Sequence, residues 1–289
     1  MQLEDCPKIK IGKLIIQGHS RSGERTCFYI YGLKIMFDAG ISTKIIPQTL
    51  MITHTHTDHI YNLPKTMYPG RSMSKLNQRP IYVPKPSILP IKNFIDSIVK
   101  LENCDMISQW SSRFNIVGVT KNQEYQLHNN YLMEVFECCH TIPCIGYGIM
   151  EKRTKLKKKY VGQDIGNLKK NLNFTELFDE KKIPLICYLG DTTLYVFINN
   201  PRLQSYPIIF IECTYLTSDM IENSKVNMHT NWIELKPWIN KYQNTKFILI
   251  HFSLRYKDLE IKKFFDKEID TMVNTNIYIW LDSGVISYR

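Results

Sequence analysis

Histidine and aspartate crowd into one short segment of the chain, His54-Thr55-His56-Thr57-Asp58-His59. The segment follows the apolar run 50–52, and the apolar residues behind it favour the start of a helix. In an extended segment, imidazoles two residues apart point to the same side, and a carboxylate and an imidazole at the turn into a helix can face a neighbouring point. Nothing in the run gives its imidazoles a packing role. The segment therefore predicts parts of two metal sites.

Three more potential metal ligands follow apolar runs later in the chain. His140 ends the run 131–139, Asp191 ends 184–190 and His251 ends 247–250. Strand ends of α/β proteins meet at the crevice where these proteins bind ligands. We therefore expect four strand ends to deliver their ligands to one rim, as a dinuclear site requires.

The remaining histidines and the nearby thiols are less informative. His229 lies in a polar loop before an expected helix, where it could cap the helix or donate a proton. His19 lies between two glycines and predicts a solvated loop, with a phosphate-binding turn as the alternative. The thiols of Cys138, Cys139 and Cys144 flank His140, and burial as small apolar residues is favoured over metal ligation.

Length and composition predict an intracellular protein with a sizeable core. The chain has 289 residues and a mass of 34.1 kDa, which suits one large α/β domain or two small ones. No apolar run reaches about 18 residues, and the polar N-terminus differs from a secretion signal, so we expect a soluble protein that is not secreted, in the cytoplasm or nucleus. The eight cysteines lie mostly in apolar runs and favour reduced thiols.

The net charge of +10 and the sequence pI near 9.1 favour a polyanionic partner. An A/T-rich codon pool is an equal alternative, since lysine is abundant and alanine occurs once, at Ala39. Residues 151–182 concentrate the positive charge and lack periodic apolar residues. This segment predicts a protruding arm or long loop inserted in the domain, and its alternative is a solvated, disordered insertion.

The rest of the chain alternates short apolar runs with helical patterns, which implies sheets with helices packed outside. The expected strands are 14–16, 27–31, 34–37, 50–52, 131–138, 183–189, 206–211 and 246–250, and the expected helices are 90–101, 232–242 and 256–267.

The histidine run fits the His-x-His-x-Asp-His signature of the metallo-β-lactamase fold, which implies α/β class, a four-layer αββα sandwich and a single domain over 1–289. Other segments resemble the ribonuclease Z (tRNase Z) family, and most closely its short eukaryotic-type form. They are Phe37-Asp38-Ala39-Gly40, Gly146-Tyr147, Gly190-Asp191-Thr192, Glu212-Cys213-Thr214, His229-Thr230, His251-Phe252-Ser253-Leu254-Arg255-Tyr256 and the basic segments 156–162 and 167–169.

The resemblance implies a ligand set for two zinc ions. One ion would be held by His54, His56 and His140, the second by Asp58, His59 and His251, with Asp191 as a bridge. Five imidazoles and two carboxylates without a thiolate suit zinc and leave positions open for water and substrate, with Mn²⁺ or Fe²⁺ as alternatives.

The same resemblance implies an endoribonuclease that removes the 3′ trailer of precursor tRNA and leaves a 3′-hydroxyl on the tRNA. A metal-bound hydroxide would attack the phosphate. Asp58 would steer the water proton, and His229, paired with Glu212, would protonate the departing oxygen. The substrate would be gripped by Lys157, Lys158, Lys159, Lys169 and Arg255, and related enzymes are commonly homodimers.

Two other interpretations remain open on the residues alone. One is a phosphodiesterase of the same fold that acts on cyclic nucleotides or other small phosphoesters. The other is an RNA-binding protein with a decayed site, which the intact set of potential ligands makes the weaker alternative.

Overall fold

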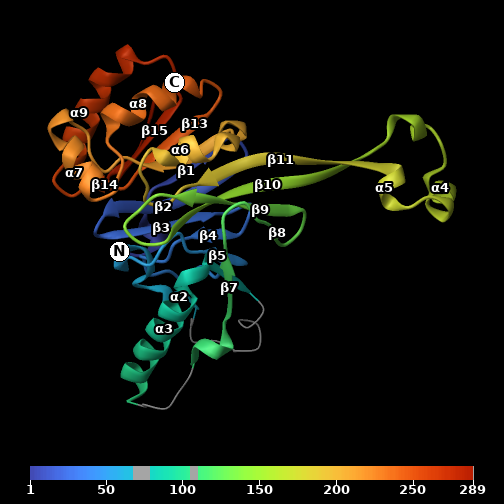
Figure 1. Cartoon of the computed structure of the whole chain (residues 1–289), viewed down its shortest axis with the longest axis horizontal. Coiled ribbons are helices and arrows are strands. Elements are labelled where there is room, and N and C mark those ends of the chain that lie inside the picture. Colours follow the sequence, from blue (N-terminus) through green and yellow to red (C-terminus); the bar gives the residue numbers. More distant parts are fainter. Residues whose placement is uncertain (68–78, 105–109, 289) are drawn as a thin grey trace.

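A computed structural model of the chain describes residues 1–67, 79–104 and 110–288. Within these ranges two eight-stranded sheets pack face to face, and helices cover the outer side of each sheet (Figure 1). This is the predicted four-layer αββα sandwich. No helix in the described ranges has both the length and the apolar character needed to cross a membrane.

The first sheet has the order β1-β2-β3-β4-β5-β6-β7, and β14 pairs with β2. Its strands are antiparallel from β1 to β4 and parallel from β4 to β7. Their bounds are β1 (Lys8–Ile11), β2 (Leu14–Ser22), β3 (Arg25–Ile30), β4 (Ile35–Phe37), β5 (Thr49–Met51), β6 (Pro80–Pro84), β7 (Asn115–Val119) and β14 (Phe252–Ser253). Because β4 and β5 are parallel, the segments that follow them leave from the same edge of the sheet.

The second sheet has the order β16-β15-β13-β12-β11-β10-β9-β8. Strands β11, β12, β13 and β15 are mutually parallel, so their carboxyl ends share one edge. The bounds are β8 (Glu124–Gln126), β9 (Tyr131–Cys138), β10 (Cys144–Leu156), β11 (Phe178–Tyr188), β12 (Ile208–Glu212), β13 (Lys246–Ile250), β15 (Ile277–Leu281) and β16 (Gly284–Tyr288).

Helices bury apolar stripes against both sheets. In α8 the buried Trp232, Leu235 and Ile239 recur at helical spacing, and the side chain of Asn231 caps its first turn by accepting a hydrogen bond from the Ile233 amide at 2.9 Å. The helices are α1 (Thr57–Ile60), α2 (Leu63–Met67), α3 (Ile88–Asn103), α4 (Ile165–Asn171), α5 (Phe174–Leu177), α6 (Tyr195–Asn199), α7 (Ile221–Val226), α8 (Trp232–Lys241) and α9 (Asp258–Glu268). Short 3-10 helices span Leu3–Asp5, Lys85–Ser87, Trp110–Arg113, Lys158–Tyr160, Pro201–Ser205, Ser218–Met220 and Ile269–Thr271.

Buried apolar side chains gather in three clusters, which correspond to the three interfaces of the sandwich. Phe28 and Trp280 belong to the cluster between the sheets, with ring centroids 5.0 Å apart. Trp232 and Phe265 lie in the cluster under α6, α8 and α9, and Ile91 lies in the cluster under α1 to α3. Burial of both faces of each sheet explains why the strands read as nearly continuous apolar runs.

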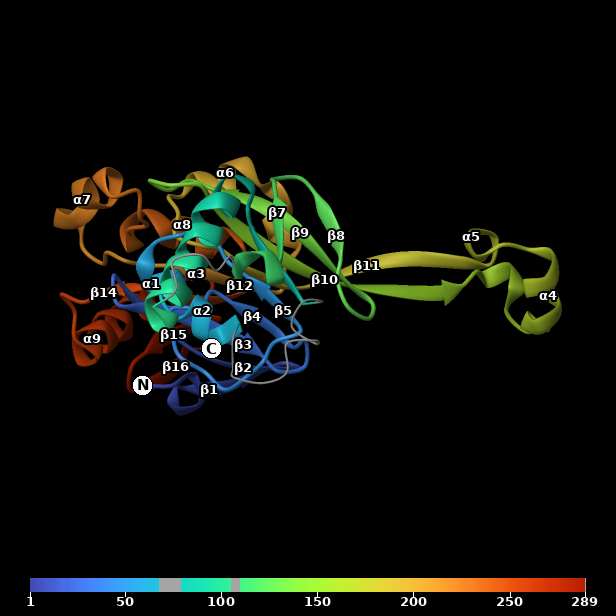
Figure 2. The same ribbon diagram turned by 90° about the horizontal axis from the view of Figure 1, so that it is seen from below.

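Strands β10 and β11 continue past the sandwich as an antiparallel ribbon that carries α4 and α5 at its far end (Figures 1 and 2). The pairing runs without interruption from Met150 and Pro184 to Leu156 and Phe178. At the tip, Leu177 is buried and the rings of Phe174 and Phe178 stack with centroids 5.0 Å apart. Residues 151–182, predicted as an arm or loop, thus have a strand base and a helical tip.

The expectation for His19 was wrong. This residue lies inside β2 and is 2% exposed, with Nδ1 3.5 Å from Oδ1 of Asp282. The Trp280 indole donates a hydrogen bond to the neighbouring Gly18 carbonyl at 2.8 Å. Polar residues near glycines looked like a loop in the sequence, but this segment pairs with β3 as a strand, and most of it is buried.

Candidate metal centre

The structure brings together all seven residues expected to bind metal. His54 and His56 follow β5, Asp58 and His59 lie in α1, His140 follows β9, Asp191 follows β11 and His251 follows β13. Their ligand atoms form two groups, each with all atoms within 4.8 Å of one another: His54, His56, His140 and Asp191 in the first, and Asp58, His59 and His251 in the second. The seven candidate ligands thus lie at one rim, which is formed by one edge of each sheet.

In the first group, three ring nitrogens point at one space. His56 Nδ1 lies 3.1 Å from His54 Nε2 and 3.1 Å from His140 Nε2. Oδ2 of Asp191 lies 3.7 Å from His54 Nε2 and 4.0 Å from His140 Nε2. The first group therefore has the form of a four-ligand site.

Asp191 also reaches the second group. Its Oδ1 lies 3.5 Å from His59 Nε2, and its Oδ2 lies 3.3 Å from His251 Nε2. Oδ2 of Asp58 lies 3.6 Å from His59 Nε2 and 3.4 Å from His251 Nε2. Asp191 thus stands between the two groups, where a bridging carboxylate would lie.

Hydrogen bonds on the outer side of four imidazoles determine which nitrogen faces inward. Two of these contacts are with hydroxyls: His54 Nδ1 lies 3.1 Å from Thr53 Oγ1, and His251 Nδ1 lies 3.1 Å from Thr214 Oγ1. The other two are with acceptors: His59 Nδ1 lies 2.9 Å from Asp38 Oδ2, and His140 Nδ1 lies 3.0 Å from the Met228 carbonyl. The Thr53 and Thr214 hydroxyls donate to carboxylates, at 3.0 Å to Asp38 and 2.6 Å to Glu212, so they accept from the rings. This network assigns the proton to Nδ1 and leaves Nε2 free to bind a metal. His56 differs, because its Nδ1 faces the centre.

The donor set fits divalent metal. His56 Nδ1 lies 3.1 Å from both His54 Nε2 and His140 Nε2, which is close to the separation of about 3.3 Å that tetrahedral zinc with bonds of about 2.0–2.1 Å would set. In the second group, the buried Nε2 of His59 has no hydrogen-bond partner among the described residues. A cation would satisfy it.

Charge and burial set the protonation of the imidazoles and carboxylates at the centre. Burial lowers the pKa of His54, His56 and His140, which keeps these imidazoles neutral as metal ligation requires. Burial also acts to lower the pKa of His59, but the Asp191 and Asp38 carboxylates outweigh it and raise that pKa well above its usual value. Burial raises the pKa of Asp191, yet His251 and His59 hold it well below its usual range.

His229 and Glu212 form a pair at the same rim. His229 Nδ1 donates to Glu212 Oε1 at 2.9 Å and lies 3.9 Å from Asp191 Oδ2. The fully buried Glu212 also accepts from the amides of Thr192 at 2.7 Å and Thr230 at 3.1 Å. Burial lowers the pKa of His229, but the Glu212 carboxylate outweighs this effect and raises it to about 9. The arrangement holds an imidazole beside the metal ligands with its Nε2 directed away from Glu212.

Two glycines permit the close approach that positions the ligands. A Cβ at Gly40 would overlap the carbonyl oxygen of Asp58, so the β4 edge can pack against α1 only with glycine there. A Cβ at Gly190 would lie 2.7 Å from both Thr53 Cβ and Cys144 Sγ. These contacts hold the Asp191 loop against the residue that precedes His54.

Comparisons with known proteins agree on one family. No family model matches the chain. The chain is 29% identical to tRNase Z TRZ1 of Arabidopsis thaliana over 270 residues, which cover 91% of this chain and 90% of that protein. It is 30% identical to the chloroplastic tRNase Z TRZ2 of Arabidopsis thaliana over 267 residues, which cover 88% of this chain and 72% of the relative. The chain belongs to the tRNase Z family.

A solved structure supports the fold. The metallo-β-lactamase fold protein YhfI from Bacillus subtilis superposes with a TM-score of 0.57 and 12% identity, covering 94% of this chain and 98% of that one. At this level of identity the likeness concerns the fold alone. The predicted metallo-β-lactamase fold is thereby confirmed.

The basic residues expected to grip the substrate lie apart from the candidate metal centre. Lys158, Lys159 and Lys169 are exposed at the tip of the arm, while the half-buried Lys157 donates a hydrogen bond to the Thr175 carbonyl at 2.7 Å. Arg255 is exposed on the main body and lies over the Tyr215 ring at 5.4 Å. The arm lysines and Arg255 therefore lie in two separate regions of the chain.

Sequence reasoning missed Asp38 as a candidate functional residue. Its fully buried carboxylate accepts hydrogen bonds from His59 Nδ1 at 2.9 Å, the Thr53 amide at 2.8 Å and the Tyr188 hydroxyl at 3.2 Å. The signal was present, because Asp38 directly follows the apolar strand β4, as the other candidates follow theirs. It has a φ of 56°, a left-handed backbone conformation that is rare outside glycine.

Proposed function

We propose that this member of the tRNase Z family is a metal-dependent endoribonuclease that removes the 3′ trailer of precursor tRNA and leaves a 3′-hydroxyl on the tRNA. The observation that carries the proposal is the placement of the His229–Glu212 pair, with His229 Nδ1 3.9 Å from the Asp191 carboxylate that stands between the two ligand groups. A hydrolytic centre and a proton donor for the leaving oxygen would thus lie side by side. The relatives named tRNase Z supply the substrate class.

In the proposed site His54, His56 and His140 hold one metal ion, Asp58, His59 and His251 hold a second, and Asp191 binds both. Histidine and carboxylate donors favour zinc, and metal analysis of the purified protein distinguishes zinc from Mn²⁺ or Fe²⁺. When bound, two such cations supply an activated water and neutralise the negative charge that grows on the phosphate.

Asp58 is placed to take the proton of the attacking water. Its Oδ2 accepts a hydrogen bond from the Gly23 amide at 3.0 Å and faces His251, and within the described ranges Oδ1 has no such contact. Burial raises the pKa of Asp58, but the His251 hydrogen bond and the His59 charge hold it well below its usual range, so the carboxylate is ionised at neutral pH. Oδ1 therefore serves as the proton acceptor.

His229 serves as the proton donor to the leaving group. Because its Nδ1 proton is committed to Glu212, its Nε2 proton is the one available to the oxygen that leaves. That oxygen is the 3′ oxygen of the last tRNA nucleotide, since the product keeps a 3′-hydroxyl. Glu212 orients the ring, with four hydrogen bonds fixing its own carboxylate.

The arm binds the tRNA away from the cleavage point. Residues 151–182 contain ten lysines and arginines against five aspartates and glutamates, and most of their side chains are exposed. Lysines contact phosphates without reading sequence, so the arm confers position rather than base specificity. Residues 1–289 then act as one domain in which the arm is an inserted exosite.

By the same resemblance we propose a homodimer in the cytoplasm or nucleus, which sedimentation and localisation experiments check.

The decisive experiment incubates the metal-loaded protein with a precursor tRNA that carries a 3′ trailer. We expect a single cut directly after the last tRNA nucleotide with a 3′-hydroxyl on the tRNA, and Asp58→Ala should lose cleavage while it still binds the tRNA. An intact substrate after incubation with the metal-loaded protein would refute the proposal.

An arm deletion separates tRNA processing from small-phosphodiester hydrolysis. Lys152 and Lys182 are paired across β10 and β11, so an Asn-Gly turn can join them in place of 153–181. This variant should keep hydrolysis of bis(p-nitrophenyl) phosphate and lose efficient tRNA cleavage. Retention of full tRNA cleavage would remove the arm from the mechanism, whereas hydrolysis of the small ester with no tRNA cleavage by the full-length protein would favour the phosphodiesterase alternative.

A further inference from the structure

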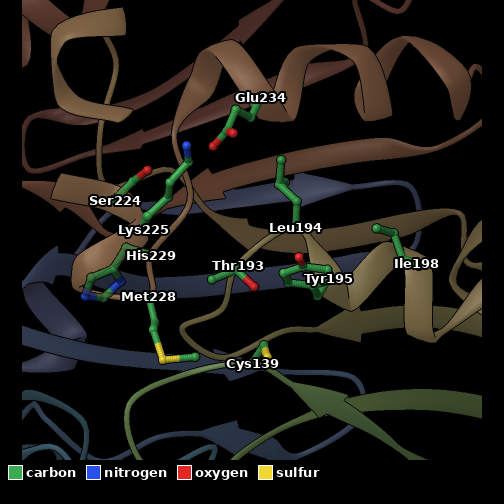
Figure 3. A pocket seen from close by; sticks show the side chains of 10 residues that line it. All are labelled: Cys139, Thr193, Leu194, Tyr195, Ile198, Ser224, Lys225, Met228, His229 and Glu234. Carbon is green, nitrogen blue, oxygen red and sulfur yellow. The ribbon is translucent and has the colours of Figure 1, made fainter. Parts of the chain in front are cut away.

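A pocket of about 430 Å³ opens beside His229 (Figure 3). It is lined by residues of α6, α7 and α8 and by the loops that carry Cys139 and Met228. The imidazole of His229 borders one end, and the Lys225 and Glu234 side chains project near one another away from it. The pocket therefore adjoins the proposed proton donor.

The pocket has an exposed apolar wall. Tyr195 and Ile198, three residues apart on α6, are 60% and 58% exposed, and Leu194 and the Met228 side chain also line it. An aromatic ring and large aliphatic side chains exposed together in a concave site indicate a binding surface. RNA-binding sites use such rings to stack unpaired bases.

Polar groups at the pocket lack partners of their own. The Thr193 Oγ1 atom is buried and has no hydrogen-bond partner among the described residues. Lys225 and Glu234 form no ion pair within the same ranges, although both line the pocket. A hydroxyl, an ammonium and a carboxylate around an apolar slot match the edge of a nucleobase and an adjoining phosphate.

The position of His229 indicates which nucleotide reaches the pocket. If His229 protonates the departing 3′ oxygen, the ribose that carries this oxygen lies against the imidazole. The base on that ribose then lies within reach of the pocket that opens beside His229. The volume is within the range of sites that hold one small ligand, so it suits a single nucleotide.

We propose that this pocket binds the base of the last nucleotide of the mature tRNA, the nucleotide immediately 5′ of the cleaved bond, by stacking on Tyr195. The proposal rests on the function proposed above. Met228 couples the pocket to the metal centre, since its side chain lines the pocket and its carbonyl accepts the His140 Nδ1 hydrogen bond at 3.0 Å. Its φ of 54° is a left-handed conformation, which places side chain and carbonyl at these two sites.

The test is a double-mutant cycle in which kcat/KM is measured for two forms of the protein on two substrates. One substrate is a precursor tRNA with a 3′ trailer, and the other carries an abasic residue at the position 5′ of the cleaved bond. For the wild-type protein we expect the abasic substitution to lower kcat/KM about 10-fold to 100-fold, the effect of losing one base stack. Tyr195→Ala should show a similar loss on the intact substrate and little further loss on the abasic one.

Two further variants serve as controls. Tyr195→Phe keeps the ring, so it should keep the wild-type penalty for the abasic substrate. Leu259→Ala removes an apolar side chain that is 60% exposed on α9, outside the pocket, so it should also keep the wild-type penalty. Since Tyr195 is exposed, Tyr195→Ala should keep the wild-type Tm; if it does not, Ile198→Ser replaces it in the cycle.

The outcomes distinguish a failure of the pocket assignment from a failure of the proposed function. Independent, multiplicative losses from Tyr195→Ala and from the abasic residue would overturn the pocket assignment while tRNA cleavage by the wild-type protein stands. No penalty for the abasic substrate would overturn it as well. Failure of the wild-type protein to cleave the intact precursor would overturn the proposed function itself and the pocket assignment with it.

Discussion

Nδ1 of His59 lies 2.9 Å from Oδ2 of Asp38, a fully buried carboxylate at the end of β4. This contact orients a proposed metal ligand of α1 from a residue 21 positions earlier in the chain. It leaves His59 Nε2 directed at Asp191 and Asp58. Carboxylates that hold a metal-binding imidazole in this way also increase its basicity. Asp38 therefore connects the first sheet to the metal centre.

Asp38→Asn should weaken metal binding at the second group. The amide keeps the shape of the side chain but removes the charge opposite His59, and loss of such a partner costs about 10-fold to 100-fold in metal affinity or activity. Chelator competition with metal analysis measures the affinity. Tyr188→Phe, which removes only the 3.2 Å hydrogen bond to Asp38, is the matched control and should show a smaller effect. Wild-type affinity in Asp38→Asn would contradict the role of the pair.

His229→Gln should slow the departure of the tRNA 3′ oxygen without removing metal. We expect kcat to fall about 100-fold to 10,000-fold on a natural precursor, because general acid catalysis contributes that much. A substrate with sulfur in place of the leaving 3′ oxygen needs no proton donor, so it should restore most of the rate. Equal losses on the oxygen and sulfur substrates would exclude His229 as the acid.

Chelation of the metal should destabilise the protein. Removing the cations leaves the buried Asp58 and Asp191 carboxylates without the metal charges that would balance them. A ligand at 100 times its Kd stabilises the folded state by about 2.7 kcal/mol, so EDTA should lower the Tm and added Zn²⁺ should restore it. Asp191→Ala, which removes the proposed bridge, should show a lower Tm and little further response to EDTA.

Gly40→Ala should lower the free energy of unfolding by about 1–3 kcal/mol and reduce activity, because the added methyl overlaps the Asp58 carbonyl and displaces α1. Gly32→Ala is the control, since a Cβ there meets nothing within 4 Å. Urea unfolding measures both variants. Equal stability of the two would show that the approach of β4 to α1 does not constrain Asp58.

Removing charge from the arm should weaken tRNA binding in a salt-dependent way. Lys158→Ala with Lys159→Ala should raise KM for precursor tRNA with little change in kcat, and the slope of log K against log salt should fall by about 0.9 for each lost phosphate contact. Lys262→Ala with Lys263→Ala removes the same charge from exposed positions on α9. Equal slopes for the two double variants would point to net charge rather than to the arm.

The sequence by itself determined the chemistry of the centre and the class of fold. The run from His54 to His59 has no packing role, and His140, Asp191 and His251 each end an apolar run, so local residue types and spacing were enough to predict a shared rim. Periodicity predicted the strands β2 to β5, β9 and β11 to β13 and the helices α3, α8 and α9, as in α8, where the apolar stripe is local; the other described strands and most of the other described helices were not predicted. The motif resemblance, which involves the same residues, predicted the family.

Only the tertiary structure decided how these parts act together. The rim combines edges of two sheets, and which nitrogen of each imidazole faces inward depends on partners distant in sequence, such as Asp38 for His59 and Met228 for His140. The burial of His19 and the pocket beside Tyr195 likewise depend on elements that meet only after folding. Hydrogen-bond partners and cavities arise from packing between segments, and a linear pattern of residue types carries no information about which segments will touch.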